Sequence, residues 1–149
     1  MEKTGSSLIS SVVVDANVVA SWFLPDESAG EHSGALDKID RIKIHVPSIF
    51  VYEFMNILVM AENKGRLNRH TQERILDMAS RLPLFIDAIS SPGWLNTSVL
   101  DIARTYHLTT YDAAYLDLSA RLGHIPLLTY DGALLAAAQK HKLKTHFTK

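Results

Sequence analysis

Four acidic residues, widely separated along the chain, lie where a carboxylate could do chemistry. Each follows an apolar run, opens a predicted helix or sits inside an apolar segment: Asp15, Glu53, Asp112 and Asp131. Carboxylates that gather in one place repel one another unless a cation joins them. An all-oxygen site suits Mg²⁺ or Mn²⁺ rather than zinc. Such an ion can activate water and stabilise the charge of a phosphoryl transition state, so the four acids are candidate catalytic and metal-binding residues.

Each acid also has a structural interpretation that the sequence leaves open. Asp15 and Asp112 could cap the helices that follow them, since a carboxylate is favourable at a helix N-terminus. Asp131 and Gly132 are a common turn pair. Glu53 could form a buried ion pair with an arginine. All four interpretations together would require these acids to reach such positions by chance, which favours a shared metal site.

Of the four sequence segments that contain these acids, the one around Glu53 is the most informative. Residues 49–60 are apolar on nearly all sides, so we expect their helix to be largely enclosed. Besides its hydrophobic residues the segment contains Glu53 and Asn56, which are three apart and share one helix face. An unpaired buried carboxylate is costly, so Glu53 should meet a cation, a hydrogen-bond donor or a water-filled cleft.

Asp117 is a further acid close to the candidate residues in sequence, but its spacing separates it from them. It lies five residues after Asp112, which is roughly 140° around a helix of 3.6 residues per turn. The two side chains should therefore point in different directions. We predict that Asp117 is a solvated or partner-facing charge, and we leave it out of the candidate site.

The elements that must position these acids alternate between strand and helix patterns. Apolar, often β-branched runs predict strands at 11–14, 42–46, 84–89, 127–129 and 144–147. Helical patterns predict a helix that begins at Asn17, a second from the N-cap Ser48 to about residue 63, and further helices at 68–81, 95–106, 112–122 and 132–141. The polar segment 26–40 is also compatible with a helix. This alternation predicts an α/β fold with a central, mostly parallel sheet flanked by helices on both faces. The carboxyl ends of such strands border the ligand crevice, which is where Asp15 and Asp131 fall.

Composition is consistent with a globular protein and excludes several chemistries. The chain has 149 residues, of which 47% are hydrophobic and 21% charged, as in an ordinary folded domain. It contains no cysteine, which excludes disulfides, cysteine-bound zinc and a thiol nucleophile. Its seven histidines show no paired-ligand spacing, so none is assigned to catalysis. The net charge of −1 does not exclude nucleic acid, because acids collected at a metal site would mask a basic surface.

The chain shows no internal repeat or linker. We expect residues 1–10 to form a flexible N-terminal extension and residues 11–149 a single domain. The start is polar and lacks the apolar core of a signal peptide. The longest apolar stretch, 49–61, is interrupted by Glu53 and Asn56 and is too short to span a bilayer. These features predict a cytoplasmic protein without membrane association.

The ordered set of motifs resembles a known family, the PIN-domain ribonucleases. The similarity is greatest to the VapC-type toxins of bacterial and archaeal toxin–antitoxin pairs, and it extends over about residues 11 to 147. It rests on Val-Val-Val-Asp15-Ala-Asn17, Pro47-x₅-Glu53-x₂-Asn56, Leu-Thr-Thr-Tyr111-Asp112-Ala113-Ala-Tyr115-Leu-x-Leu-x-Ala120 and Leu-Leu-Thr129-Tyr-Asp131. No single motif is strong, but the four in this order are fairly specific.

The resemblance implies a PIN-like fold and divalent-metal-dependent endonucleolytic cleavage of RNA. The cofactor would be Mg²⁺ or Mn²⁺, and the partners an RNA substrate, a cognate antitoxin and a second copy in a homodimer. Metal-site roles pass to the four acids, with polar support from Asn17, Asn56 and Thr129. Trp22, Phe23 and the apolar faces of the Glu53 helix would serve either a partner groove or ordinary core packing.

Two other functions fit part of the pattern. A phosphatase of the haloacid dehalogenase type also places an aspartate after its first strand, but it needs a second aspartate two residues later, where this chain has Asn17. A non-catalytic α/β binding module for nucleotides or proteins is the other alternative. The chain lacks the glycine-rich phosphate loops that a nucleotide-binding module would use. The metal-dependent ribonuclease is therefore the leading hypothesis.

Overall fold

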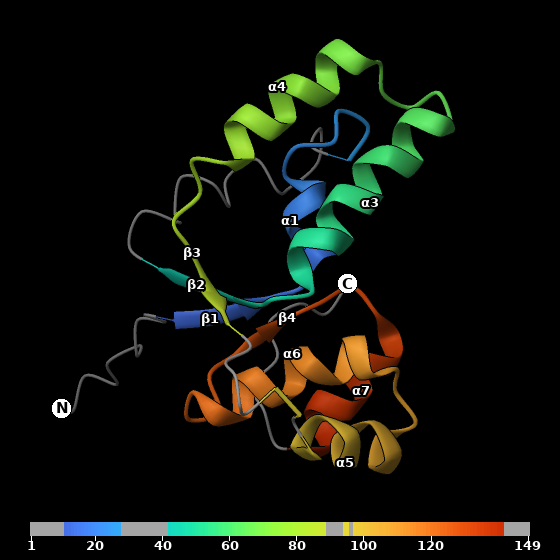
Figure 1. Ribbon diagram of the computed structural model, residues 1–149. Coiled ribbons are helices and arrows are strands. Elements are labelled where there is room, and N and C mark those ends of the chain that lie inside the picture. Colours follow the sequence, from blue (N-terminus) through green and yellow to red (C-terminus); the bar gives the residue numbers. More distant parts are fainter. Residues whose placement is uncertain (1–10, 28–41, 89–93, 96, 142–149) are drawn as a thin grey trace, which may run out of the picture.

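The computed structural model describes residues 11–27, 42–88, 94–95 and 97–141 (Figure 1). Within these residues the strands form one sheet of order β3-β2-β1-β4, and each neighbouring pair is parallel. Their bounds are Ser11–Val14 (β1), Lys43–Pro47 (β2), Leu84–Asp87 (β3) and Leu127–Leu128 (β4). The α/β class and the parallel sheet are thereby confirmed. The expected strand at 144–147, the extension 1–10 and most of segment 26–40 lie outside the described residues.

Helices cover both faces of this sheet, as predicted. In the order of the chain they are Ala16–Ser21 (α1), Phe50–Asn63 (α3), Arg69–Ala79 (α4), Thr97–Tyr106 (α5), Thr110–Arg121 (α6) and Gly132–Lys140 (α7). In Figure 1, α1, α3 and α4 lie on one side of the sheet, and α5, α6 and α7 lie on the other. The sheet is thus the middle layer of three. In the described part of the chain, no helix is long and apolar enough to cross a membrane.

The central strand β1 explains where the core forms. Val12, Val13 and Val14 are buried, because helices cover both faces of the strand. Full burial of one such side chain stabilises the fold by about 1.5–3 kcal/mol. On one edge β1 pairs with β2, and on the other with the short strand β4, where the Asp15 N–H donates to the Leu128 carbonyl at 2.9 Å. The chain leaving β1 therefore runs beside the chain leaving β4.

Several predicted helices begin at other residues in the structure, and backbone hydrogen bonds give the reason for the helix that contains Glu53. We expected Ser48 to cap the helix that contains Glu53, but Ile49 stands at that position without a capping side chain. The Ile49 carbonyl already accepts from the N–H groups of Tyr52 and Glu53, each at 3.1 Å, so the helix begins one residue later than Ser48 would allow. Likewise α6 begins at Thr110 rather than at the predicted position 112.

The helix around Glu53 is not enclosed as we predicted. One side of α3 is buried through Phe50, Phe54 and Leu58, whereas its other side is exposed, with Tyr52 at 69%. An apolar sequence pattern on all sides of a helix does not specify whether other elements cover its outer side. Here α1 and α4 contact α3 but do not enclose it. For Trp22 and Phe23 the sequence left open either a partner groove or core packing. Trp22 is buried and Phe23 packs edge-on against Phe54, so both belong to the core.

Candidate active site

Asp15 lies at the carboxyl end of the central strand, where α1 begins. Its side chain is only 5% exposed. Thr129, which directly follows β4, donates its hydroxyl to Asp15 Oδ2 at 2.8 Å. Since β1 and β4 are neighbours, two residues that are 114 positions apart in sequence meet at one end of the sheet.

Glu53 reaches the same region from α3. The Tyr115 hydroxyl donates to Glu53 Oε2 at 2.5 Å, and Tyr115 is fully buried in α6. Among the described residues Glu53 forms no ion pair with an arginine, so that interpretation of the acid is wrong. We predicted no site role for Tyr115. Its spacing of three from Asp112 on one helix was the signal that could have identified it.

Asp112 lies in the first turn of α6, and Thr109 rather than Asp112 is the helix cap. The Thr109 Oγ1 accepts from the Asp112 N–H at 3.1 Å and donates to Asp112 Oδ2 at 2.7 Å. The capping interpretation of Asp112 is therefore wrong. The same threonine starts the helix and holds the Asp112 carboxylate at its first turn.

The charges of these acids act on one another. Burial is the main cause that raises the pKa of Asp15, and the Asp112 charge raises it further. Burial also raises the pKa of Glu53, and the charges of Asp15 and Asp112 add to that effect. Hydrogen bonds from Thr129 to Asp15 and from Tyr115 to Glu53 oppose these shifts by stabilising the charged carboxylates. Asp15, Glu53 and Asp112 therefore form one electrostatic site.

Asp131 joins this site indirectly. Its Oδ1 accepts from the Leu134 N–H at 2.7 Å and caps α7, which agrees with the structural interpretation of this acid. Its own N–H donates to Thr129 Oγ1 at 3.0 Å. The threonine that holds Asp15 thus also holds the backbone of Asp131. Asn17 and Asn56 are both exposed.

The donors of this site fit Mg²⁺ or Mn²⁺ in type, since they are carboxylate and hydroxyl oxygens. Acids that repel one another at a buried position are also what a cation would stabilise. Over the residues that the structure describes, no three side chains of His, Asp or Glu are close enough to hold one ion in their present positions. Binding would therefore need carboxylates to turn toward the ion.

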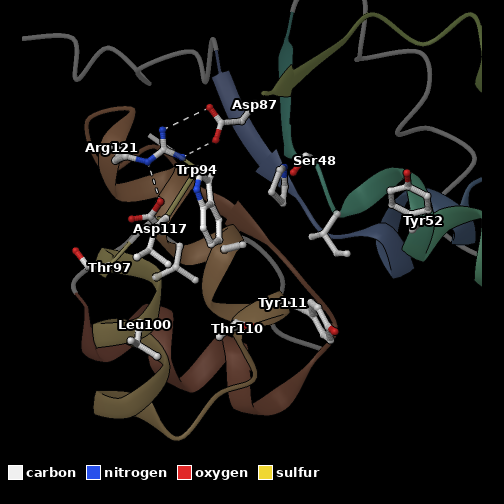
Figure 2. A pocket seen from close by; sticks show the side chains of 15 residues that line it. Ser48, Tyr52, Asp87, Trp94, Thr97, Leu100, Thr110, Tyr111, Asp117 and Arg121 are labelled. Carbon is white, nitrogen blue, oxygen red and sulfur yellow. Dashed lines mark hydrogen bonds and ion pairs between the residues drawn. The ribbon is translucent and has the colours of Figure 1, made fainter. Parts of the chain in front are cut away.

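Our prediction that Asp117 is a solvated or partner-facing charge is wrong, since the residue is only 2% exposed and its side chain lies against Arg121 (Figure 2). Its carboxylate pairs with Arg121 Nε at 2.7 Å and accepts the Ser98 hydroxyl. Arg121 in turn pairs with Asp87 at the end of β3 at 2.6 Å. Helix α6 packs against both the sheet and α5, so the side that faces away from Asp112 is covered as well.

A cavity of about 590 Å³ lies between the start of α3 and helices α5 and α6 (Figure 2). Its lining includes Tyr52 and Tyr111, the immediate sequence neighbours of Glu53 and Asp112, but none of the four candidate acids. Trp94 and Leu95 also line it, and both are exposed. The helices that carry Glu53 and Asp112 therefore border an apolar surface that the rest of the described chain does not cover.

The fold is that of an established family. A family model described as PIN domain matches residues 12–148, and the chain therefore belongs to the PIN domain family. The chain is 26% identical over 125 residues to Ribonuclease VapC3 of Pyrobaculum aerophilum. The aligned region covers 83% of this chain and 91% of that protein. The alternative of a haloacid dehalogenase-type phosphatase is set aside, because it belongs to another family.

Two solved structures share the fold. The crystal structure of PAE2754 from Pyrobaculum aerophilum has a TM-score of 0.64 and 22% identity, and the match covers 90% of this chain and 83% of that one. The crystal structure of FitAcB from Neisseria gonorrhoeae has a TM-score of 0.60 and 14% identity, with 90% and 95% covered. These matches confirm the PIN-like architecture that the sequence predicted.

Proposed function

We propose that this protein is a divalent-metal-dependent endoribonuclease that cleaves RNA phosphodiester bonds, and that it is the toxin of a type II toxin–antitoxin pair. The observation that carries the proposal is the proximity of Asp15, Glu53 and Asp112, which come from three separate elements: besides burial, the Asp112 charge raises the pKa of Asp15, and the charges of Asp15 and Asp112 raise the pKa of Glu53. Membership of the PIN domain family and similarity to Ribonuclease VapC3 support a nuclease activity.

We propose that these three acids hold Mg²⁺ or Mn²⁺, with Asp131 as a fourth ligand. When bound, the ion would supply a water of lowered pKa and stabilise the charge of the phosphoryl group. Thr129 donates to Asp15 and Thr109 donates to Asp112, so one hydrogen bond restricts each of these two carboxylates. The exposed amides Asn17 and Asn56 are supporting polar groups that can hydrogen-bond water or RNA.

We further propose a cognate antitoxin and a second copy of this chain as protein partners. Exposed apolar side chains on α3, among them Val51, Met55 and Val59, support such contacts. Trp94 and Leu95 beside the cavity do so as well. A contiguous apolar surface of this kind is more typical of protein interfaces than of a free surface.

Cleavage assays with purified protein test the proposed activity. We expect RNA to be cleaved with Mg²⁺ or Mn²⁺, and cleavage to stop when EDTA is added, because the acids offer no nucleophile without the ion. Asp15→Asn should abolish cleavage while the protein stays folded. Asp101→Asn, which changes an exposed aspartate on α5, is the matched control and should keep full activity. Cleavage that survives EDTA, or that survives in Asp15→Asn, would contradict the mechanism, and inactivity of the wild type would favour a non-catalytic binding module.

A further inference from the structure

The contact between Tyr115 and Glu53 joins two layers of the molecule. Glu53 comes from α3 and Tyr115 from α6, and these helices lie on opposite sides of the sheet (Figure 1). Tyr115 is 0% exposed, and a buried phenol needs a hydrogen-bond partner. The partner that it has is a carboxylate oxygen of the candidate site, at 2.5 Å. A charge-assisted bond of this length is short and directional.

The position of Tyr115 on α6 places this donor next to a second acid. Tyr115 follows Asp112 by three residues, and residues at that spacing lie on one face of a helix. One turn of α6 therefore presents a carboxylate and, beside it, the hydroxyl that holds another carboxylate.

Glu53 needs such a tether more than Asp15 does. Asp15 is almost fully buried and has a short side chain, so packing restricts it, and Thr129 donates to its Oδ2. Glu53 is only half-buried and has a longer, more flexible side chain. Without a fixed partner its carboxylate could turn to solvent. The Tyr115 bond uses Oε2 and leaves Oε1 for another ligand.

We propose that Tyr115 is a positioning residue, which holds Glu53 Oε2 so that Oε1 is directed to a bound divalent cation. This inference rests on the metal-dependent function proposed above, and it assigns to Tyr115 a role that acts through Glu53. Groups that orient metal ligands matter because they hold the ligand in its binding geometry before the ion arrives. The competing explanation is that Tyr115 only fills the core and satisfies its own hydroxyl.

Tyr115→Phe separates the two explanations, because it keeps the ring and removes the hydroxyl. We expect its Kd for Mn²⁺, measured by calorimetry, to rise about 10-fold, at the lower end of the roughly 10- to 100-fold typical for lost outer partners of metal ligands. Tyr106→Phe is the matched control. Tyr106 also loses a hydrogen bond, 2.9 Å to His141 Nδ1, but away from the acids, and its Mn²⁺ Kd should not change.

A double-mutant cycle with Glu53→Met shows whether Tyr115 acts through Glu53. Glu53→Met removes the acceptor, so Tyr115→Phe should then cause no further change in the Mn²⁺ Kd. The same cycle, repeated on urea unfolding in EDTA, tests the hydrogen bond without any metal. The positioning role would be overturned if Tyr115→Phe weakened Mn²⁺ binding equally in the wild type and in Glu53→Met, or if it left the Kd for Mn²⁺ unchanged. The proposed nuclease function would still stand in either case. Absence of Mn²⁺ binding by the wild type would overturn both, whereas normal Mn²⁺ coupling without RNA cleavage would overturn the nuclease function alone.

Discussion

Individual side chains of the site combine burial with repulsion. Burial is the largest cause that raises the pKa of Asp15 and of Glu53, and neighbouring carboxylates add to it. Two hydroxyl groups, on Thr129 and Tyr115, offset part of this effect by donating to the charged forms. Such a site is destabilising when no cation is present, because charged acids are held together out of water.

This repulsion predicts a pH dependence of the metal-free protein. The pKa values of Asp15 and Glu53 are raised, so the folded chain binds the protons of these two acids more tightly than the unfolded chain does. The stability that the two acids contribute in EDTA should therefore be fully present below their ordinary pKa values of 3.8 and 4.5 and should be lost as pH rises through the raised values. A rise of one pKa unit corresponds to about 1.4 kcal/mol. Urea unfolding of the wild type and of Asp15→Asn between pH 4 and pH 8 in EDTA measures this pH dependence of the free energy of unfolding.

Asp15→Asn removes one of the titrating groups, so its stability should fall less than that of the wild type over the same range. The variant should also unfold at higher urea in EDTA near neutral pH. Mg²⁺ should stabilise the wild type by mass action and the variant less. If both proteins lost stability in parallel with rising pH, the buried repulsion would not exist at Asp15.

The helices contribute through their first turns. Thr109 caps α6 and also donates to Asp112, so the start of this helix and the position of an acid depend on one side chain. Asn68 caps α4 in the same way, accepting from the Thr71 N–H at 2.8 Å, but it lies at a helix without a candidate acid. The two caps are therefore a natural pair for comparison.

Replacement of each cap by alanine should separate helix stability from site geometry. Thr109→Ala and Asn68→Ala should each lower the free energy of unfolding by about 0.5–2 kcal/mol. Only Thr109→Ala should also weaken Mn²⁺ binding, because only Thr109 holds a candidate ligand, and Thr109→Ser should restore both properties. Thermal melts and Mn²⁺ titrations check this. Equal Mn²⁺ affinity in the two alanine variants would show that the Thr109 contact to Asp112 has no role in the site.

The whole molecule presents an uncovered apolar surface on the helices that carry two of the candidate acids. Residues of α3 and α6, which carry Glu53 and Asp112, line the cavity of about 590 Å³, and the outer side of α3 is exposed. A protein that covered this surface would contact both helices. This proximity suits a toxin whose activity a bound partner controls, as we propose.

Growth of cells that express the chain alone tests this proposal. Expression should arrest growth, because uncontrolled cleavage of RNA is toxic, and Asp15→Asn or Asp112→Asn should relieve the arrest. Asp101→Asn, at an exposed position of α5, should arrest growth as the wild type does. Colony counts after induction, with protein levels compared on a gel, give the measurement. Relief by Asp101→Asn at equal expression, or no relief by Asp15→Asn, would show that the arrest does not come from the acid site.

Local patterns in the sequence were sufficient to predict the strands and their order of alternation with helices. The valines of β1 are β-branched and apolar, and such runs form buried strands wherever helices cover both faces. The placement of Asp15 after that strand follows from the same pattern, whereas the predicted strand 127–129 ends one residue earlier, before Thr129. These features depend on residues that are close together in the chain, and for that reason the sequence alone determined them.

Long-range packing decided the rest. The sequence did not show that Tyr115 would reach Glu53, which is 62 residues away, nor that Asp117 would be buried beside Arg121. It also suggested an enclosed helix where Tyr52 is exposed. Helical periodicity specifies which residues share a face, but it does not specify what covers that face. That depends on which layers meet in the folded chain, and only the tertiary structure determined it.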